Sequence, residues 1–254
     1  MKIKIVAKKN YPELKILRDN FKRSSKCDIC IAVGGDGTFV RAAKGTDAPI
    51  LPIRSNDDGS VGYYSDLSLK DMDFVVKNLK KHKFTIERLG NKIELIFKKG
   101  RYYAVNEARL NNQMEEVSFR ISEVSGKHIS RIYPYVMSGD GIVVTGQIGS
   151  TAYNKSAEGP IILSPNVLCL TFLNPDGPYR NPIIIDASKE IEIEVVKYLG
   201  ILRYDSTEIG KIRPRQKFRV KFSNKELRVV RFKEKREEFA DKLERIIKRR
   251  MVTR

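Results

Sequence analysis

The hydrophobic pattern of the chain changes near Phe84, and this change constrains the possible folds more than any other feature. Before it, short apolar runs alternate with segments of helical period. After it, apolar residues recur at every second position without long helical segments. Alternating strands and helices predict an α/β domain with a parallel, Rossmann-like sheet, whereas successive period-two segments predict a β-rich domain. We therefore predict two domains, residues 1–82 completed by 232–254, and residues 83–231.

The pattern also predicts the elements of each domain. In the first domain we expect strands over residues 2–7, 29–33 and 50–53. Between them we expect helices over 11–21, 39–44 (capped by Thr38) and 69–81. In the second domain the expected strands are 84–89, 93–97, 102–105, 117–124, 129–136, 142–145, 167–173, 183–185, 191–196, 218–222 and 227–230. A last helix over 233–250 carries an apolar stripe, which predicts that it packs back on the first domain.

Composition limits the class of protein. The 254 residues are 41% hydrophobic and 31% charged, and no apolar run approaches the roughly 18 residues that span a bilayer, so we expect a globular protein without a membrane partner. Three cysteines are too few for a disulfide framework and favour the cytoplasm. Cys27 and Cys30 have metal-like spacing but no second pair, so we expect them to be structural.

Lys and Arg outnumber Asp and Glu by 49 to 31, which gives a net charge of +18. Such a charge attracts polyanions in general and does not choose among nucleic acid, membrane surfaces and phosphate compounds. The basic residues are scattered along the whole chain, and no basic run is interleaved with aromatic residues. Most of this charge is therefore expected on the solvated surface.

The glycine-rich segment Gly34-Gly35-Asp36-Gly37-Thr38 follows the apolar run over 29–33 directly. Open α/β sheets bind ligands at this place, where a strand ends and a helix begins. Glycines let the backbone approach an anion, and the helix N-terminus offers unpaired N–H groups to a phosphate. A carboxylate repels phosphate unless it takes a proton or meets a metal ion, and both are roles in phosphoryl transfer. Taken alone, the segment is equally consistent with a tight turn in which Asp36 caps a helix.

Later motifs support the first interpretation. The glycine-rich segment resembles the Gly-Gly-Asp-Gly-Thr signature shared by NAD kinases, phosphofructokinases and the diacylglycerol and sphingosine kinases, which phosphorylate hydroxyl groups. Tyr103 to Ala108 is similar to the Asn-Glu motif of NAD kinases, and Asp140-Gly141 followed by Gly149 to Ser156 is similar to their Gly-Ser-Thr-Ala-Tyr segment. The stretch Arg180-Asn181-Pro182-Ile183 also matches. By order and spacing along most of its length, the chain resembles the NAD kinase family.

The resemblance implies transfer of a phosphoryl group from ATP or polyphosphate, with Mg²⁺ or another divalent cation, to the 2′-hydroxyl of the adenosine ribose of NAD. The first domain would bind the donor and the second NAD. The implied roles are catalysis for Asp36, donor phosphate binding for Gly35, Gly37 and Thr38, and NAD binding for Asn106, Glu107, Asp140, Thr151, Ala152, Tyr153 and Ser156. It names no protein ligand for the metal, implies a homodimer or homotetramer, and requires no specific nucleic acid.

Two segments depart from the family pattern. Gly146-Gln147-Ile148 stands where the family usually has Thr-Pro-Thr, and residues 54–59 replace a Gly-x-Asn-x-Gly loop. Two alternatives therefore stay open. One is a related kinase that acts on a lipid, sugar or polyol hydroxyl. The other is a basic protein without enzyme activity that binds nucleic acid.

Overall fold

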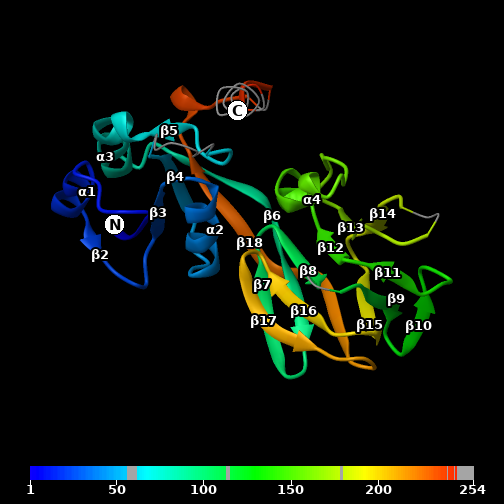
Figure 1. Cartoon of the computed structure of the whole chain (residues 1–254). Helices are drawn as coiled ribbons and strands as arrows, with labels where there is room; N and C mark the ends of the chain where they lie inside the picture. The colour runs from blue at the N-terminus through cyan, green and yellow to red at the C-terminus, as the bar shows by residue number, and fades with distance from the viewer. Residues whose placement is uncertain (56–61, 113–114, 178–179, 239, 243, 245–254) are drawn as a thin grey trace. The chain divides into compact units, whose positions relative to one another are not determined.

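The chain folds into two compact units, which the computed structural model describes for all residues except 56–61, 113–114, 178–179, 239, 243 and 245–254 (Figure 1). One unit comprises Met1–Leu89 with Leu227–Arg254, and the other comprises Gly90–Glu226. The first holds a parallel sheet with helices and the second is made almost entirely of antiparallel strands. The predicted combination of an α/β domain and a β-rich domain is confirmed.

The sheet of the first unit is parallel. Its strands are β1 (Lys2–Ala7), β2 (Lys22–Arg23), β3 (Ile29–Val33), β4 (Ile50–Arg54) and β5 (Leu67–Ser68), paired in the order β2-β1-β3-β4-β5. All five residues of β3 are buried, as expected for a central strand that is covered on both faces. The end of β18 (Lys217–Arg231) also joins β4, through Val229 opposite Ile50.

Helices cover both faces of this sheet. Helix α1 (Leu14–Asn20), the 3₁₀ turn η1 (Leu69–Asp71) and α3 (Met72–Lys80) share one apolar cluster with Ile3, Ile31 and Ile53. Lys4, the next residue along β1, points to the opposite face, where its Nζ donates to the carbonyl of Gly45 at the end of α2 (Asp36–Lys44). Helix α2 therefore covers the second face.

Three helix predictions for this unit need correction. The first helix begins at Leu14 rather than Tyr11, because a turn in which the N–H of Leu14 donates to Tyr11 precedes it. Thr38 does not cap α2: the cap is Gly35, with no side-chain hydrogen bond, and Thr38 lies inside the first helical turn. The segment over 69–81 divides into η1 and α3.

The second unit is built from two antiparallel layers around one core. One layer is the six-stranded sheet β14-β13-β12-β8-β16-β17. The other layer joins β10, β9, β15 and the first half of β18, with β11 pairing β9 and β6 pairing β7 and β18. The core takes alternate residues of both layers, such as Leu110 and Val144 from the first and Phe119 and Ile193 from the second. The strands are β6 (Thr85–Phe97), β7 (Gly100–Ala104), β8 (Glu107–Asn111), β9 (Val117–Ser125), β10 (His128–Arg131), β11 (Met137–Gly139), β12 (Gly141–Thr145), β13 (Val167–Leu173), β14 (Ile183–Asp186), β15 (Glu190–Lys197), β16 (Gly200–Tyr204) and β17 (Thr207–Ile212).

The strand predictions for this unit agree with the structure in segments that are rich in apolar residues. Four strands were not predicted: β8, β11, β16 and β17. The predicted pairs 84–89 with 93–97 and 218–222 with 227–230 are each one long strand, β6 and β18. The strand expected over 129–136 ends at Arg131. Two short helical segments, η2 (Ile148–Thr151) and α4 (Tyr153–Ser156), follow β12.

After β18 the chain forms the 3₁₀ turn η3 (Lys233–Lys235), and residues 240–242 and 244 are helical. Ion pairs attach this segment to the rest of the first unit: Lys235 contacts Asp71 at 2.9 Å, and Lys242 contacts Asp66 at 2.6 Å. The remainder of the helix expected over 233–250, including its apolar positions from 245 onward, lies outside the described residues. No helix in the described part of the chain is long and apolar enough to cross a membrane.

Candidate active site

The glycine-rich segment forms the turn between β3 and α2. Gly34 donates its N–H to the carbonyl of Ile53 on β4 at 2.9 Å, which holds the turn against the carboxyl edge of the sheet. Gly34 has φ +152°, and a Cβ on it would lie 2.4 Å from Oγ1 of Thr38. Only glycine fits there, because both the backbone angle and the buried hydroxyl exclude a side chain. The turn therefore depends on Gly34 and Thr38 together.

Asp36 is the first residue of α2, and its side chain is half-buried. The N–H of Tyr64 donates to Oδ1 of Asp36 at 3.3 Å, which fixes the carboxylate. Burial, and then the charge of Asp36, raises the pKa of Tyr63 above its ordinary value, so this phenol also lies within the field of the carboxylate. The geometry places one oriented carboxylate at a helix N-terminus that can bind phosphate.

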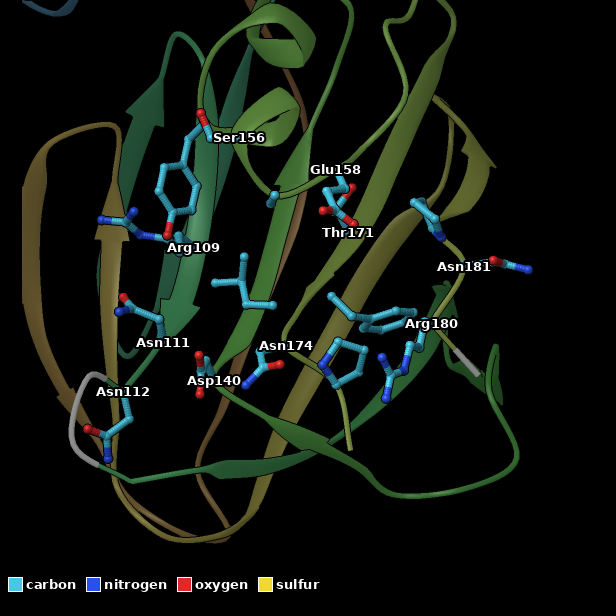
Figure 2. Close-up of a pocket in the computed structure, with 16 residues that line it drawn as sticks. Arg109, Asn111, Asn112, Asp140, Ser156, Glu158, Thr171, Asn174, Arg180 and Asn181 are labelled. Carbon is cyan, nitrogen blue, oxygen red and sulfur yellow. The ribbon is translucent and has the colours of Figure 1, made fainter. Parts of the chain in front are cut away.

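A large polar cavity lies in the second unit. It has a volume of about 840 Å³ (Figure 2). Its floor is the outer face of the six-stranded sheet, where Arg109 of β8 and Thr171 of β13 flank Val143 of β12 in register. The opposite face of these strands supplies core residues, so strand alternation separates the apolar core from the polar floor. The residues that line the cavity are Arg109, Asn111, Asn112, Asp140, Tyr153, Ser156, Ala157, Glu158, Thr171, Phe172, Leu173, Asn174, Pro175, Arg180, Asn181 and Pro182.

Asp140, Asn111 and Asn112 lie at one end of this cavity (Figure 2). The backbone fixes their positions: the N–H of Asn112 donates to the carbonyl of Asp140 at 3.0 Å, and the N–H of Asp140 donates to Leu173 at 2.9 Å. Gly141 makes this approach possible, because its φ is +143° and a Cβ would lie 2.0 Å from the carbonyl oxygen of Leu110. A ligand at this end meets carboxylate and amide groups that can bind an amide or hydroxyl group.

The segment from η2 to α4 is held onto the sheet by Asn154, which is fully buried. Thr171 on the cavity floor donates to Oδ1 of Asn154 at 2.6 Å, and Nδ2 of Asn154 donates to the carbonyl of Pro160 at 2.9 Å. Gly149 lets the segment approach the sheet, since a Cβ there would lie 1.9 Å from the carbonyl oxygen of Asn106. These contacts bring the Asn-Glu motif and the Gly-Ser-Thr-Ala-Tyr segment together.

A buried carboxylate, Asp205, positions the Asn-Glu motif. Its Oδ1 accepts the N–H of Asn106 at 2.7 Å, and both of its oxygens accept the N–H of Val105 at 3.1 Å. In return the N–H of Asp205 donates to the carbonyl of Glu107 at 2.9 Å. Sequence reasoning missed Asp205, because it lies 98 residues after Glu107 and no local pattern marks it.

Of the seven residues predicted to bind NAD, Asp140, Tyr153 and Ser156 line the cavity. Asn106, Glu107, Thr151 and Ala152 do not line it, although contacts with Gly149 and Asp205 tie Asn106 to the same region. Arg109 lines the cavity and was missed. Its guanidinium carbon lies 4.4 Å from the ring centroid of Tyr153 in a cation–π contact. The signal was the alternation Glu107, Arg109, Asn111, which places all three side chains on one face of a strand.

The departures from the family pattern have local structural reasons. A Cβ on Gly146 would lie 2.6 Å from the Phe222 ring, so a larger residue does not fit there. Gln147 donates from Nε2 to the carbonyl of Leu163 at 2.9 Å, and Ile148 packs against Gly90. The departure at 54–59 falls largely on residues 56–61, which lie outside the described part of the chain.

Cys27 and Cys30 are both free cysteines. In the part of the chain that the structure describes, no group of three or more His, Cys, Asp or Glu side chains is arranged to hold a metal ion. Cys30 is buried, and burial, followed by the nearby Cys27, raises the pKa of its thiol to about 11. At neutral pH this sulfur is therefore an unreactive thiol, as expected of a structural cysteine.

Family models match most of the chain. The ATP-NAD kinase N-terminal domain matches residues 3–84, and the ATP-NAD kinase C-terminal domain matches residues 114–232. Among curated relatives, the NAD kinase of Thermotoga neapolitana is 31% identical over 187 residues, which cover 73% of this chain and 70% of the relative. The NAD kinase of Sulfurimonas denitrificans is 26% identical over 220 residues, covering 83% of this chain and 75% of the relative.

Solved structures show the same fold. An NAD kinase from Archaeoglobus fulgidus in complex with ATP superposes with a TM-score of 0.76 at 19% identity, covering 97% of this chain and 99% of the other. Yeast NADH kinase complexed with NADH superposes with a TM-score of 0.79 at 16% identity, covering 97% of this chain and 86% of the other. Residues 85–113, which include Asn106 and Glu107, fall between the two family-model matches.

Proposed function

The chain belongs to the ATP-NAD kinase family, and from that premise we propose how it phosphorylates NAD. Asp36 accepts the proton of the 2′-hydroxyl of the adenosine ribose as this oxygen attacks the terminal phosphoryl group of the donor. A bond forms between the 2′-oxygen and phosphorus, the bond from phosphorus to the donor's bridging oxygen breaks, and NADP is the product.

The observation that carries this proposal is the position of Asp36. Its carboxylate begins α2 directly after two glycines, and Tyr64 orients it. The N-terminus of α2, where Asp36 lies, is a kind of backbone site that binds phosphate. We therefore place the donor's phosphoryl group beside the carboxylate that takes the acceptor's proton. Gly35, Gly37 and Thr38 are the residues that we propose to shape the donor site.

The NAD acceptor would bind through Asn106, Glu107, Thr151, Ala152, Tyr153 and Ser156 at the adenosine end and through Asp140 at the nicotinamide end. Two features support this assignment. The cavity that holds Asp140, Tyr153 and Ser156 is large enough, at about 840 Å³, for a nucleotide-sized ligand. Its end near Asp140 carries amide and carboxylate groups, which suit the carboxamide of a nicotinamide ring.

A divalent cation fits this chemistry as part of the donor complex. Mg²⁺ is commonly held by one or two carboxylates together with substrate phosphates, and Asp36 is a carboxylate at the phosphate-binding turn. The donor's phosphates would supply protein-independent ligands for the ion at this turn, next to the Asp36 carboxylate. The ion would supply neutralising charge for the phosphoryl group. The remaining parts of the proposal are polyphosphate as an alternative donor, assembly as a homodimer or homotetramer, and a cytoplasmic location.

Asp36→Asn tests the proposed base. This variant keeps the shape of the side chain and removes its ability to take a proton, so NADP formation from NAD, Mg²⁺ and ATP should fall by about 100- to 10,000-fold. NAD should still protect the variant against thermal unfolding. Asp73→Asn is the matched control, because Asp73 is an exposed acid in the first turn of α3. Wild-type turnover in Asp36→Asn would show that another group is the base.

A further inference from the structure

A second cavity lies at the edge of the parallel sheet, far along the chain from the residues that line the first. It has a volume of about 610 Å³ and lies between β1, α1 and the segment after β2. Its basic residues are Lys4, Lys9, Arg18 and Arg23, and its neutral polar residues are Asn10, Ser24 and Ser25. None of the described residues that line it carries a carboxylate. We name it the basic groove.

The groove exists because β2 is very short. The pairing of β1 with β2 ends at Ile3 opposite Arg23, where the N–H of Ser24 donates to the carbonyl of Ile3 at 2.9 Å. Beyond this point no strand among the described residues lies on that side of β1, and Lys4 to Ala7 are only half-buried. Four steps along a strand, from Ile3 to Ala7, span about 13 Å. The groove is therefore elongated along the strand.

Two cations of the groove, Arg18 and Lys4, donate hydrogen bonds to neutral groups. Arg18 donates from Nη2 to Oδ1 of Asn10 at 2.8 Å, and Lys4 donates from Nζ to the carbonyl of Gly45 at 3.0 Å. These bonds orient the cations without cancelling their charge. A surface of this kind attracts an anion whose charge is distributed along its length.

One end of the groove adjoins the glycine turn. Ala7 and Lys9 line the groove, and Lys8 between them donates its N–H to the carbonyl of Val33, the residue before Gly34, at 3.0 Å. Arg41 of α2 donates from Nη2 to the carbonyl of Ala7 at 2.8 Å. A chain of phosphates that begins at the turn therefore finds the groove directly beside it.

From this juxtaposition we propose that the basic groove binds an extended chain of phosphate groups, namely the part of an inorganic polyphosphate donor that lies beyond the glycine turn. The inference rests on the proposed function, because it assigns the turn to the reacting end of the donor. ATP has only three phosphates, which would lie near the turn and would not extend along the whole groove. The groove thus distinguishes a long donor from a short one.

Single-stranded nucleic acid carries phosphates too, but the groove does not suit it. Proteins that bind single strands combine positive charge with aromatic side chains on which bases stack. Within the described part of the chain, no aromatic side chain is among the residues that line the groove. An inorganic chain, which has no bases, matches a groove whose described polar side chains are cations, one amide and two hydroxyl groups beside the apolar side chains of β1 and α1.

Direct binding is the first test. Long-chain inorganic polyphosphate would be titrated into the intact protein by calorimetry at several salt concentrations, with tripolyphosphate and single-stranded DNA as comparison probes. In Arg18→Glu/Arg23→Glu the affinity for long-chain polyphosphate should fall roughly tenfold or more at low salt. The slope of log affinity against log salt should fall by about 1 for each cation lost. Arg18→Lys/Arg23→Lys should retain most of the slope.

The control variant is Lys127→Glu/Lys211→Glu, which changes the net charge equally at two exposed positions of the second unit. It should keep most of the affinity that the groove variant loses. Equal losses in both variants would show general attraction by a basic protein and would overturn the proposal. Unchanged binding in the groove variant would show that these cations only protect the open edge of β1 from pairing with other chains.

Turnover gives the second test. The ratio of polyphosphate-supported to ATP-supported NADP formation should fall in Arg18→Glu/Arg23→Glu and stay constant in the control variant. If the wild-type protein forms NADP from ATP but none from polyphosphate, the proposed role of the groove is wrong and the kinase assignment remains intact. No NADP from either donor would contradict the proposed function itself. Tighter binding of DNA than of polyphosphate, lost with Arg18 and Arg23, would identify a nucleic-acid site instead.

Discussion

At the scale of single residues, the glycine turn contains glycines that are needed for different reasons. Gly34 has a positive φ and contacts the hydroxyl of Thr38, so the fold itself requires it. Gly37 lies inside α2, and a Cβ on it would meet nothing within 4 Å. Glycine costs a helix roughly 0.5–1 kcal/mol relative to alanine. Packing therefore gives no reason for Gly37, whereas the close approach of a donor phosphate that we propose at this turn would give one.

Gly37→Ala should consequently separate stability from activity. We expect the free energy of unfolding to stay the same or rise by up to about 1 kcal/mol, since alanine favours the helix. We expect the KM for ATP to rise, because the added methyl group occupies space that the donor would use. Urea denaturation measures the first quantity, and initial rates at varied ATP concentration measure the second.

Gly34→Ala is the matched comparison. Its methyl group would clash with Thr38 and strain the backbone, so we expect a loss of stability of about 1–3 kcal/mol. A Gly37→Ala protein with reduced stability and an unchanged KM for ATP would mean that the glycine serves the fold and that the donor lies elsewhere.

Motif residues could be predicted from the sequence, but the residues that hold them in place could not. Asp36 could be proposed from the sequence because a glycine-rich turn after a buried strand is a local signal. Asp205 and Asn154 act through hydrogen bonds to residues far away in the chain or on another strand, namely the backbone of Asn106 and the hydroxyl of Thr171. The order of the strands in the sheets decides which buried polar groups lie close enough to form hydrogen bonds. This order is not visible in a single sequence.

At the scale of elements, density of apolar residues decided which strands the sequence revealed. Strand β13 was predicted with its observed bounds because six of its seven residues are buried. Strands β8 and β16 supply few side chains to the core, and charged residues such as Arg109 and Arg203 alternate with them. Strands β6 and β18 continue through Gly90 and Ser223, residues that resemble turn signals. Sheet pairing outweighs the local preference of these residues.

The start of the α3 region has a capping box that gives stability a specific pH dependence. The N–H of Ser68 donates to Oδ2 of Asp71 at 2.8 Å, and Lys235 contacts Oδ1 at 2.9 Å. Burial raises the pKa of Asp71, but the hydrogen bonds from Ser68 and Lys235 outweigh it and hold this pKa below its ordinary value. The stabilising contribution of Asp71 is therefore complete above about pH 4, the unfolded value, and disappears as the pH falls through the lower folded value.

Asp71→Asn should lower the free energy of unfolding by about 1 kcal/mol at pH 7, as expected for the loss of a cap. Its difference from wild type should shrink as the pH is lowered below about 4. Urea denaturation at a series of pH values measures both. Asp73→Asn, at an exposed position in the first turn of α3, should show little difference at any pH. A constant difference across the series would indicate that the charge of Asp71 is not involved.

At the scale of the whole molecule, the net charge of +18 acts on both substrates. The parts of the chain differ in how they use it: the described lining of the basic groove has no acids, whereas the first cavity includes Asp140 and Glu158 beside Arg109 and Arg180. A positive field raises the local concentration of anions, and salt screens it with a length of about 8 Å at physiological ionic strength. ATP carries more negative charge than NAD, so the field favours the donor more than the acceptor.

Ionic strength should therefore affect the two substrates unequally. As NaCl is raised, kcat/KM for ATP should fall more steeply than kcat/KM for NAD, because the electrostatic attraction grows with substrate charge. Initial rates with one substrate varied and the other saturating give both slopes, and sodium glutamate in place of NaCl separates screening from chloride binding. The thermal unfolding midpoint at each salt concentration shows whether the protein stays folded. Equal slopes for the two substrates would mean that the long-range field contributes little to affinity. Local contacts, such as those of Arg109 in the cavity and of the glycine turn, would then determine it.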